Sequence, residues 1–588
     1  MDSPTQCDVA IIGGGPVGLT SSILLSLRGI NHVLFERHPN TSIHPKACGI
    51  NQRTVEIFRV MGIEDEVYAH AAPPEIAGRT AWYTSLGSGG REIVSRDAWG
   101  GGIYEKEYQR YSPSRYCILP QIRLEPILKR RAIELNPQRI HYSSEVTGIE
   151  QDKDSATLTV RRNRINERIQ ARYVIAADGG RSITDTLNIP WLGERNIFNM
   201  VTAHFKSPLR TLHPDPRNFI TWFSNPEMGG STKTGYLYQI GPWPLQTGKE
   251  EWVFACALTE QDPERFTEET MIGRTRQTLA IPDLQIDMCS FSHWNVNAIH
   301  AARYRVNRIF LAGDAAHKIP PWGALGMNTG VQDVQNLIWK LQLALRNESK
   351  YDTLLDTYDT ERRPIGKRVG LSSLHNCRSH AGVMDVALGL AEDKSAEENK
   401  SNIASAFDAN HPSYREKRAA INKAQKVLDI EFKAPGTEIG WFYPKVDVGG
   451  QGGRTHGDQL LADGSLNTEF YFPSTIPGHH VPHAWLERGG KRCAVQDLVP
   501  LDKLVLFSRR SGWEALADER VVHELIGEES WQDVDGDWAE HCGVDGDGAV
   551  LVRPDGIVAW RGGRDGLTTV SWKCLIDRIL CCSISNGA

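Results

Sequence analysis

Six residues near the N-terminus have the types and spacing of a phosphate-binding turn: Gly13, Gly14, Gly15, Pro16, Val17 and Gly18. They follow an apolar run at 8–12, which predicts a buried strand, and precede a helical pattern over 19–28. In such a turn the first glycine permits the tight bend, the second lets a pyrophosphate approach the backbone, and the third lets strand and helix pack closely. The N–H groups at the start of the helix then face the phosphates. The pattern therefore predicts a dinucleotide-binding turn.

An acidic residue stands where such a turn needs one. Glu36 lies 18 residues beyond Gly18, at the end of the run 32–36, which predicts the second strand of a βαβ unit. Its carboxylate is predicted to accept a hydrogen bond from the adenosine ribose. Arg37 follows it and is included in the predicted cofactor site.

A second motif joins a strand to a long helix. Residues 308–317 place Asp314 directly after an apolar run, where its carboxylate can bond the ribityl or ribose hydroxyls of a long cofactor. A loop rich in Pro and Gly follows, before a helical pattern at 332–346, and its backbone N–H groups can stabilise an electron-rich ring edge. This combination fits a flavin. The loop residues included in the predicted site are Pro320, Pro321, Gly326, Met327 and Asn328.

These motifs need a parallel sheet to position them, and the rest of the chain supplies its other parts. Helical patterns recur around 53–61 and 121–136, and spaced β-rich runs fill 190–295. The predicted fold class is α/β: a Rossmann-type domain with an inserted β-sheet domain and a small C-terminal α/β domain. The predicted divisions are 1–189 and 298–380 for the first domain, 190–297 with segments at about 75–115 for the inserted sheet, 381–433 for a helical connection, and 434–588 for the last domain.

The C-terminal domain has its own pattern of elements. A strand is predicted at 504–508, a helix at 512–526, and a strand-turn-strand at 550–560 around Pro554-Asp555-Gly556. The sequence contains no CxxC, so this domain cannot exchange disulfides through a dithiol pair. We expect it to serve in packing or in stabilising a homodimer.

Length and composition exclude several classes of protein. With 588 residues, 40% hydrophobic and 23% charged, the chain is too long for one hydrophobic core and too apolar for a disordered protein. The formal net charge of -6 and the lack of a long basic run argue against a nucleic-acid partner. No apolar run approaches ~20 residues, so we expect no membrane span and a cytoplasmic protein. The 11 scattered cysteines predict reduced thiols and no metal site.

Together these motifs resemble those of the FAD-dependent aromatic hydroxylases with the para-hydroxybenzoate hydroxylase fold. The resemblance covers nearly the whole chain and is closest to the phenol and dichlorophenol hydroxylase branch, which carries a C-terminal thioredoxin-like domain. It implies that the glycine turn binds the ADP part of FAD, that Asp314 binds the ribityl region, and that the Pro320–Pro321 loop lies beside the isoalloxazine ring. It also implies that NADPH or NADH visits the FAD domain transiently, because the sequence has one dinucleotide turn.

Two further segments resemble family signatures. Residues 173–182 contain the Asp-Gly turn at Asp178, which in the family contacts FAD and the nicotinamide donor. The arginine that usually follows is replaced by Asp185, and either weaker docking of the donor or surface drift would explain the change. Gln121 matches the family glutamine that bonds the flavin side chain, and an N-terminal helix cap is its alternative role.

The stretch His44–Glu56 resembles a family segment that precedes a helix, with departures. Lys46 and Arg53 keep positive charge for the FAD pyrophosphate or the incoming dinucleotide. The phenol hydroxylases carry an aspartate base at about the position of Cys48, so its absence puts phenol deprotonation by that route in doubt. A small packing residue is the alternative role for Cys48.

Two tyrosines complete the candidate catalytic group. Tyr236 and Tyr238 are two residues apart on a predicted strand, so their rings point to the same face. The resemblance implies a tyrosine near the substrate, and ordinary sheet packing is the alternative. The catalytic candidates are therefore Tyr236, Tyr238, Cys48 and Pro321.

The resemblance also implies a reaction. It indicates a monooxygenase that reduces FAD with NADPH or NADH, forms a flavin C4a-hydroperoxide with dioxygen, and inserts one oxygen atom into a phenolic or other aromatic substrate. Polyketide or terpenoid secondary metabolism is the expected setting. Two alternatives stay open at this point: a Baeyer–Villiger or epoxidising flavin monooxygenase, and a non-enzymatic binding protein on an FAD-type fold.

Overall fold

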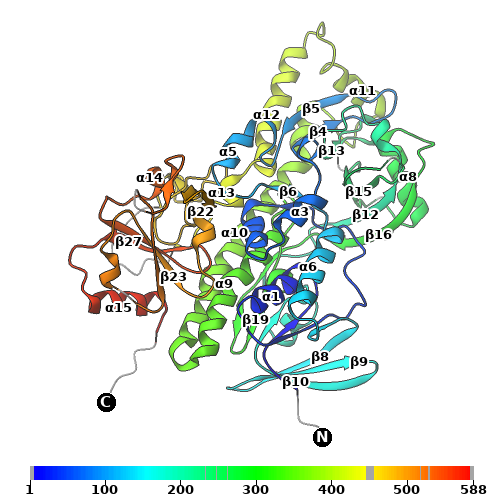
Figure 1. The fold of residues 1–588 in the computed structure, drawn as a ribbon. Helices are drawn as coiled ribbons and strands as arrows, with labels where there is room; N and C mark the ends of the chain where they lie inside the picture. Colours follow the sequence, from blue (N-terminus) through cyan, green and yellow to red (C-terminus); the bar gives the residue numbers. More distant parts are fainter. Residues whose placement is uncertain are drawn as a thin grey trace.

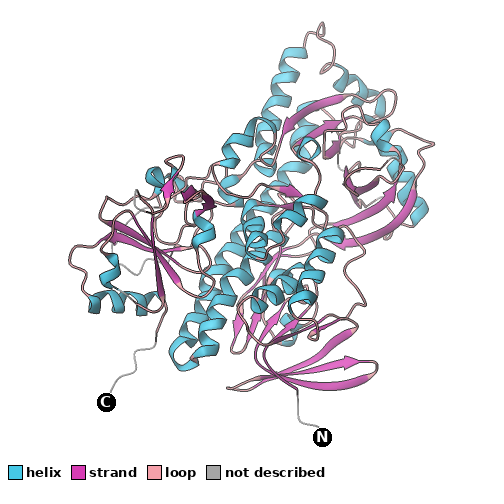
Figure 2. Cartoon of the chain, viewed as in Figure 1, coloured by secondary structure: helices cyan, strands magenta, loops and turns pink. Residues whose placement is uncertain are grey.

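Two large sheets and a smaller C-terminal sheet, with helices packed between and around them, make up most of the chain (Figures 1 and 2). The computed structural model describes residues 5–231, 233–246, 248–260, 262–444, 456–516, 518–527 and 530–582. The mixed α/β fold class predicted from the sequence is confirmed.

The first sheet is the dinucleotide-type sheet. Its strands are β1 Thr5–Ile12, β2 His32–Phe35, β7 Ile140–His141, β8 Ser144–Gln151, β9 Ala156–Arg162, β10 Ile165–Ala176, β18 Arg305–Val306 and β19 Ile309–Leu311. They lie in the order β18-β19-β10-β1-β2-β7, and the β8-β9 hairpin pairs with β10. The central strand β1 is parallel to both neighbours and is buried along Val9–Ile12, as a sheet covered on both faces requires.

Four parallel strands of this sheet end at the same edge. Ile12 is paired with both Phe35 and Ala176, and Ala176 is paired with Leu311. Open parallel sheets bind ligands beyond the carboxyl ends of their strands. The segments that meet at this edge are the glycine turn, Glu36, the Asp178 turn and the Gly313–Asp314 turn. The pairing of these parallel strands therefore brings four predicted parts of the site to one edge of the sheet.

Helices cover this sheet and extend beyond it. Those before residue 347 are α1 Pro16–Ser26, α2 Gln52–Val60, α3 Glu64–His70, α4 Pro74–Ala77, α5 Glu105–Gln109, α6 Gln121–Leu135, α7 Ile183–Thr186, α8 Glu268–Leu279 and α9 Gly326–Arg346. The later ones are α10 Glu348–Leu388, α11 Ala396–Ala404, α12 Tyr414–Phe432 and α13 Pro435–Glu438. Helix α9 begins six residues before the predicted start at 332, because the buried Asn328 and Thr329 interrupt the apolar pattern of its first turn.

The second sheet contains a segment from the N-terminal part of the chain. Its strands are β4 Arg79–Tyr83, β5 Glu92–Asp97, β12 Asn199–Lys206, β13 Ile220–Phe223, β14 Tyr236–Gly241, β15 Glu251–Ala257 and β16 Asp287–Asn295, in the order β16-β12-β15-β14-β13-β4-β5. Alternate side chains enter different cores: Leu237 packs with α8, whereas Tyr236 and Tyr238 belong to a cluster shared with α10 and α12. The latter face lies toward the first sheet's loops.

The C-terminal part forms a four-stranded mixed sheet with one helix against it. It comprises β23 Leu504–Ser508, β24 Val521–Leu525, β26 Gly548–Val552, β27 Val558–Gly563 and helix α15 Thr569–Ile579. The predicted helix at 512–526 is wrong: within it, Trp513–Leu516 form a single 3₁₀ turn and Val521–Leu525 form β24. Two adjacent valines pair with the buried strand β23, and this pairing outweighs the helical pattern around them.

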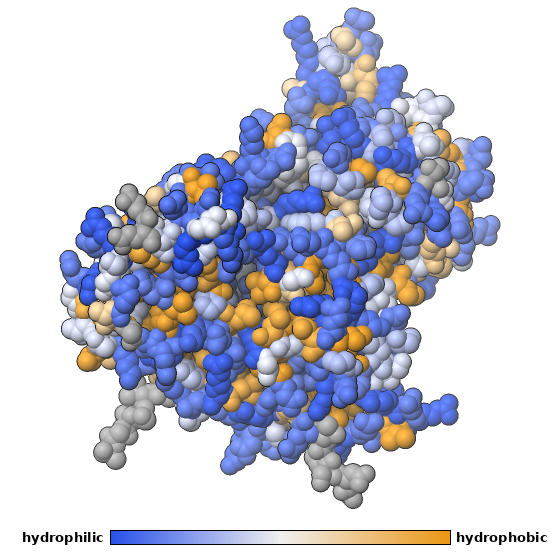
Figure 3. Space-filling model, in the orientation of Figure 1, coloured by the Kyte–Doolittle hydropathy of each residue, from blue (hydrophilic) through white to orange (hydrophobic). Residues whose placement is uncertain are grey.

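The surface is mostly polar on the face shown in Figure 3, where apolar residues form small groups. The most exposed large apolar side chains, Ile103, Val386 and Val570, come from three separate elements. None of the described helices has both the length and the apolar character that crossing a membrane requires. The homodimer stays a prediction.

Helix α13 carries a buried acid whose protonation is coupled to folding. The Glu438 carboxylate accepts hydrogen bonds from the Ala434 N–H at 3.1 Å and the Tyr108 hydroxyl at 3.3 Å, and burial raises the pKa of Glu438 to about 7. Because the folded pKa lies above the ordinary value of 4.5, this acid stabilises the fold fully below pH 4.5. The stabilisation is lost as pH rises to about 7 and amounts to roughly 3 kcal/mol.

We therefore expect Glu438→Gln to stabilise the protein at alkaline pH and to leave it nearly unchanged at acidic pH. Thermal unfolding midpoints of variant and parent, measured at pH 5 and pH 8, give this difference. A difference that is equal at both pH values would contradict the raised pKa.

Candidate active site

The glycine turn leaves open space at the start of α1. A Cβ at Gly13 would lie 2.2 Å from the Ala177 carbonyl oxygen, and one at Gly18 would lie 1.9 Å from the Gly13 carbonyl oxygen. A Cβ at Gly15 would meet no atom of the described residues within 4 Å. Gly13 and Gly18 are thus required by the packing of strand and helix, whereas Gly15 borders an open cradle. A pyrophosphate facing the N–H groups of α1 fits this cradle.

Glu36 lies beside the turn. Its carboxylate accepts hydrogen bonds from the Gly14 N–H at 2.6 Å and from the His38 N–H at 2.8 Å. These bonds hold the carboxylate at the end of β2, at the position where a ribose hydroxyl is bound in dinucleotide folds. Arg37 is exposed, and its guanidinium donates to the neighbouring His38 ring at 3.2 Å.

Asp314 occupies the same sheet edge. Its side chain is exposed to solvent, yet burial by the surrounding protein raises the pKa of its carboxyl. The nearby charges of His317, Lys46 and Arg181 oppose this rise in the pKa of Asp314. Lys46 and Arg181 come from two other loops, so the structure brings three segments together around this carboxylate.

The Asp178 turn is shaped by its own carboxylate. The Asp178 side chain accepts hydrogen bonds from the N–H groups of Gly180, Ser182 and Ile183 at 2.9–3.1 Å and so holds the start of α7. Asp185, which stands where the family usually has an arginine, accepts a hydrogen bond from the Trp191 indole at 3.2 Å. Asp185 therefore has a structural partner nearby.

Three other predicted residues have structural partners. Gln121 does not cap α6: Pro120 is the capping residue, and the Gln121 amide donates to Glu125 at 2.5 Å. Arg53, 4% exposed, donates to Glu56 at 2.8 Å and to the Tyr471 hydroxyl at 3.3 Å, so a phosphate role for it stays a prediction. Asn328 donates to the carbonyl oxygens of Gly49 and Ala324 at 2.9 and 2.7 Å and accepts from the Asn51 N–H at 3.0 Å.

The remaining predicted residues lie at the start of α9 and in the loop before it. Met327 packs partly buried against the first sheet's core, and a Cβ at Gly326 would make ordinary contact with Ile319. Pro320 is buried and Pro321 is exposed. The next residue, Trp322, packs on Phe198 with ring centroids 5.8 Å apart. The loop therefore connects the Asp314 edge to the aromatic face of the second sheet.

That aromatic face brings the catalytic candidates together. Tyr236 and Tyr238 stack with ring centroids 6.0 Å apart, and Cys48 packs against the same cluster as Trp322. Burial raises the pKa of both phenols and raises that of Cys48 to about 12. All three therefore keep their protons at neutral pH. Cys48 cannot act as the base that takes a phenol proton there, which favours the packing role.

Two polar residues of this face carry no sequence motif and were not predicted. His380 of α10 lies against Trp222, with ring centroids 3.7 Å apart, and its Nδ1 is 2.9 Å from the Glu431 carboxylate of α12. Both side chains are buried, and within the described part of the chain the contact through Nδ1 is the hydrogen bond that the His380 ring makes. The partners are 51 residues apart on two helices, so only the fold brings them together.

The same face contains enclosed indole N–H groups without partners. Among the described residues, the Nε1 atoms of Trp222, Trp243 and Trp322 are buried and make no hydrogen bond. Each is a hydrogen-bond donor packed mainly among aromatic and aliphatic side chains. Buried donors of this kind favour a ligand that combines an aromatic ring with oxygen acceptors.

Comparisons with known proteins agree on one family. Residues 6–372 match the model of an FAD binding domain, and residues 474–575 match that of the C-terminal domain of aromatic-ring hydroxylases. The chain is 32% identical to phenol 2-monooxygenase of a Pseudomonas species over 579 residues, which cover 95% of this chain and 90% of that protein. It is 31% identical to tetracenomycin A2 monooxygenase-dioxygenase of Streptomyces glaucescens over 585 residues, with 95% and 94% covered.

A solved structure extends the agreement to three dimensions. The crystal structure of the flavin-dependent monooxygenase PieE in complex with FAD and substrate matches this fold with a TM-score of 0.89 and 31% identity. The match covers 98% of this chain and 100% of that one. Since the family model spans more than half of the sequence and the relatives align almost end to end, the chain belongs to the aromatic-ring hydroxylase family of FAD-dependent monooxygenases, with FAD as its cofactor.

Proposed function

We propose that the protein inserts one oxygen atom of dioxygen into a phenolic substrate, with NADPH or NADH as the electron donor. The observation that carries this proposal is the position of the aromatic face, which the Pro320–Trp322 loop joins to the Asp314 edge. FAD, when bound, accepts the hydride and activates dioxygen. The names of the relatives support the substrate class, since they are a phenol monooxygenase and a tetracenomycin monooxygenase. The form of the activated oxygen stays a prediction.

The chain's own residues bind and orient the reactants in this proposal. The cradle at Gly15 and the carboxylates of Glu36 and Asp314 hold FAD. Tyr236, Tyr238 and Trp222 form the wall against which an aromatic ring packs, and they exclude water from the reacting atoms.

The His380–Glu431 pair is the proposed proton acceptor. A phenol is activated toward oxygen insertion when it loses its proton, and Cys48 keeps its own proton at neutral pH. In the proposal the phenol proton moves to the His380 Nε2, and the Glu431 carboxylate stabilises the resulting imidazolium across the 2.9 Å contact. The aspartate expected from the family is thereby replaced by a pair on two helices.

The reaction can be tested directly. Phenols and polyketide phenols are screened for stimulation of NADPH and NADH oxidation, and the products are analysed by mass after reaction under ¹⁸O₂. We expect a product that gains one labelled oxygen on the ring. An unlabelled product would contradict oxygenation, and a ring-expanded ester from a carbonyl substrate would favour the Baeyer–Villiger alternative.

Substitution of Tyr238 tests the aromatic face. Tyr238→Phe removes one hydroxyl from a side chain that is 7% exposed and keeps its packing on Phe219. We expect the fraction of electrons that reach product to fall several-fold, with the remainder released as hydrogen peroxide, while the FAD content stays unchanged. The ratio of product to oxidised NADPH and the yield of peroxide measure this coupling.

Tyr83→Phe is the matched control for this variant. Tyr83 lies on the same sheet but enters the core on the opposite face, where its hydroxyl bonds Glu92 at 2.7 Å. Its loss should not change the coupling. An unchanged coupling ratio in Tyr238→Phe would remove that tyrosine from the site and leave the FAD assignment intact.

A further inference from the structure

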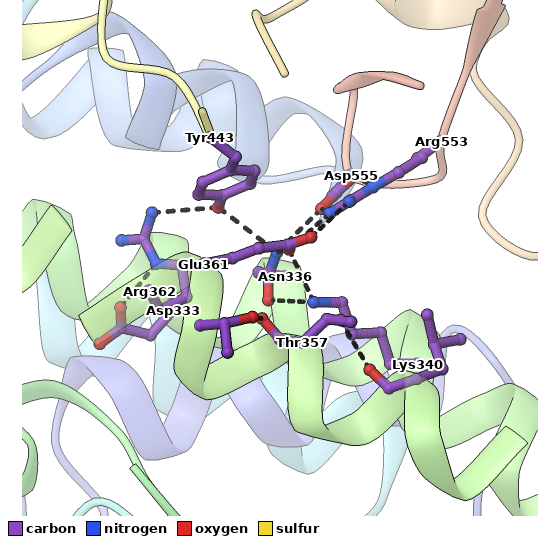
Figure 4. A network of polar contacts seen from close by, with 11 residues as sticks. Asp333, Asn336, Lys340, Thr357, Glu361, Arg362, Tyr443, Arg553 and Asp555 are labelled. Carbon is purple, nitrogen blue, oxygen red and sulfur yellow. Dashed lines mark hydrogen bonds and ion pairs between the residues drawn. The ribbon is translucent and has the colours of Figure 1, made fainter. Parts of the chain in front are cut away.

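A buried polar network joins the C-terminal sheet to the FAD-binding part of the chain (Figure 4). We call it the junction network, and its members are Asp333, Asn336, Lys340, Glu361, Arg362, Tyr443, Arg553 and Asp555. Each is at most 9% exposed. The three carboxylates are balanced by three cations, so the network is electrically neutral inside the protein.

The C-terminal sheet contributes the turn between β26 and β27. Arg553 in this turn forms a double hydrogen bond with the Glu361 carboxylate of α10, at 2.7 and 2.9 Å, and a second one with Asp555 at 3.0 and 2.6 Å. Bidentate pairs of this kind fix orientation as well as distance. Asn336 of α9 then joins the two acids, donating to Glu361 at 2.7 Å and to Asp555 at 3.1 Å.

A second arm of the junction network runs from Tyr443 toward the sheet edge. The Tyr443 hydroxyl accepts hydrogen bonds from Arg362 at 3.2 Å and from Asn336 at 3.3 Å. Arg362, also over the Trp441 ring, donates through Nε to the Asp333 carboxylate at 2.8 Å. Both charged side chains have no exposed surface.

Asp333 connects this arm to the motif that holds Asp314. Its other oxygen accepts hydrogen bonds from the Gly313 N–H at 3.1 Å and from the His317 Nε2 at 2.8 Å. Gly313 has φ +60° and immediately precedes Asp314, and His317 is 1% exposed. The Asp333 carboxylate therefore fixes both ends of the turn that contains Asp314. Arg362 bonds this carboxylate directly, and Tyr443 bonds Arg362.

We propose that Tyr443 and the Arg553–Asp555 pair are positioning residues for the cofactor: they fix, through Arg362 and Asp333, the turn that presents Asp314 to FAD. This inference rests on the placement of FAD proposed above. It gives the C-terminal part, which has no dithiol motif, a role in cofactor binding that does not require redox chemistry of its own.

The residue types in the junction network indicate that it positions the Asp333 carboxylate, beyond holding the two parts of the chain together. Six buried charges are expensive to desolvate, and well-packed apolar residues would join two units at least as firmly. An apolar contact, however, would not define where the oxygens of Asp333 point. A chain of bidentate and charge-assisted hydrogen bonds does define it, because each partner has a fixed direction.

Tyr443→Phe is the first test, since it removes only the hydroxyl that Arg362 and Asn336 share. The apo-proteins are titrated with FAD well below their unfolding temperatures, and the midpoint potential of the bound flavin is measured. We expect the dissociation constant for FAD to rise about tenfold, in line with the loss of a hydrogen bond to a charged group. We also expect the potential and the visible spectrum of the flavin to shift, which looser domain packing alone would not produce.

Tyr108→Phe is the matched control. Tyr108 is 3% exposed and its hydroxyl bonds Glu438 of α13, but no hydrogen bond among the described residues joins that hydroxyl to Asp333. It should leave the FAD dissociation constant within about twofold of the parent value. Equal weakening in both tyrosine variants would overturn the inference, because it would reflect general loosening of the junction.

Two further variants separate the possible failures. If Tyr443→Phe does not fold, Asp555→Asn, which keeps the shape of the turn and weakens its pairing with Arg553, should raise the dissociation constant about threefold. Asp314→Ala tests the placement itself and should yield largely apo-protein. Normal FAD binding by Tyr443→Phe together with its loss in Asp314→Ala would overturn the inference and keep the placement, whereas full FAD occupancy in Asp314→Ala would overturn both.

Discussion

A Gly15→Val variant is expected to fold normally and to purify without FAD. The Cβ at this position meets no atom of the described part of the chain within 4 Å, so the backbone has room for a side chain here. The added methyl groups then occupy the cradle at the start of α1, and the pyrophosphate can no longer approach the backbone. We expect the dissociation constant for FAD to rise by at least about a hundredfold, equivalent to roughly 3 kcal/mol. Absorbance of the purified protein in the flavin bands and FAD titration of the apo-protein measure the effect.

Gly18→Val is the informative comparison. Its Cβ would lie 1.9 Å from the Gly13 carbonyl oxygen, so strand β1 and helix α1 would have to separate. Overpacking of this kind costs about 1–3 kcal/mol or more, and we expect loss of folded protein together with loss of FAD. If Gly15→Val kept its yellow colour, the glycine turn would not be the pyrophosphate site.

Removal of one buried charge is expected to destabilise the protein strongly without preventing it from folding. Arg362→Met leaves the Asp333 carboxylate, which has no exposed surface, without its guanidinium partner. Breaking a buried ion pair in this way costs about 3–5 kcal/mol, because the remaining charge stays desolvated. We expect the thermal unfolding midpoint to fall by about 5 °C, because the unfolding entropy of a unit as large as residues 6–372 is roughly 0.8 kcal/mol/K. Scanning calorimetry of the apo-protein measures this without any contribution from FAD.

The adjacent arginine provides the control. Arg363 pairs with Asp359 at 3.2 Å one turn away on the same helix, but its side chain is 36% exposed. Partly exposed pairs of this type contribute about 0.3–0.5 kcal/mol, so Arg363→Met should move the midpoint by less than about 1 °C. Equal effects of the two substitutions would contradict a special role for the buried pair.

The site residues at the edge of the first sheet could be predicted because each one lies next to its strand in the sequence. The glycine turn, Glu36 and Asp314 each follow directly after an apolar strand, and parallel strands bring their carboxyl ends to one edge. The face shared by Tyr236 and Tyr238 also followed from the two-residue period of a strand. The helix expected at 512–526 failed because its outcome depends on pairing with β23, a strand outside that segment.

Other parts of the site could not be predicted from local patterns. His380 and Glu431 look like ordinary residues of two polar helices, and their partnership depends on how α10 and α12 pack. Arg553 and Glu361 are separated by 192 residues, and neither lies in a sequence motif that predicts their contact. In the absence of the fold, such residues are indistinguishable from solvated charges, although burial makes them among the most costly groups to disturb.

The interleaving of the two large sheets has a consequence for synthesis on the ribosome. Strand β4 pairs with β13, which is synthesised about 140 residues later. Strand β10 pairs with β19, which follows the whole second sheet in the sequence. The second sheet therefore cannot close before residue 295 has emerged, and the first cannot close before residue 311. Until their partners emerge, one edge of β4 and one edge of β10 stay unpaired. Contacts this distant in sequence slow folding and favour aggregation of incomplete chains. Slower translation or a chaperone that shields strand edges should accordingly raise the yield of active protein more than a lower temperature applied after synthesis.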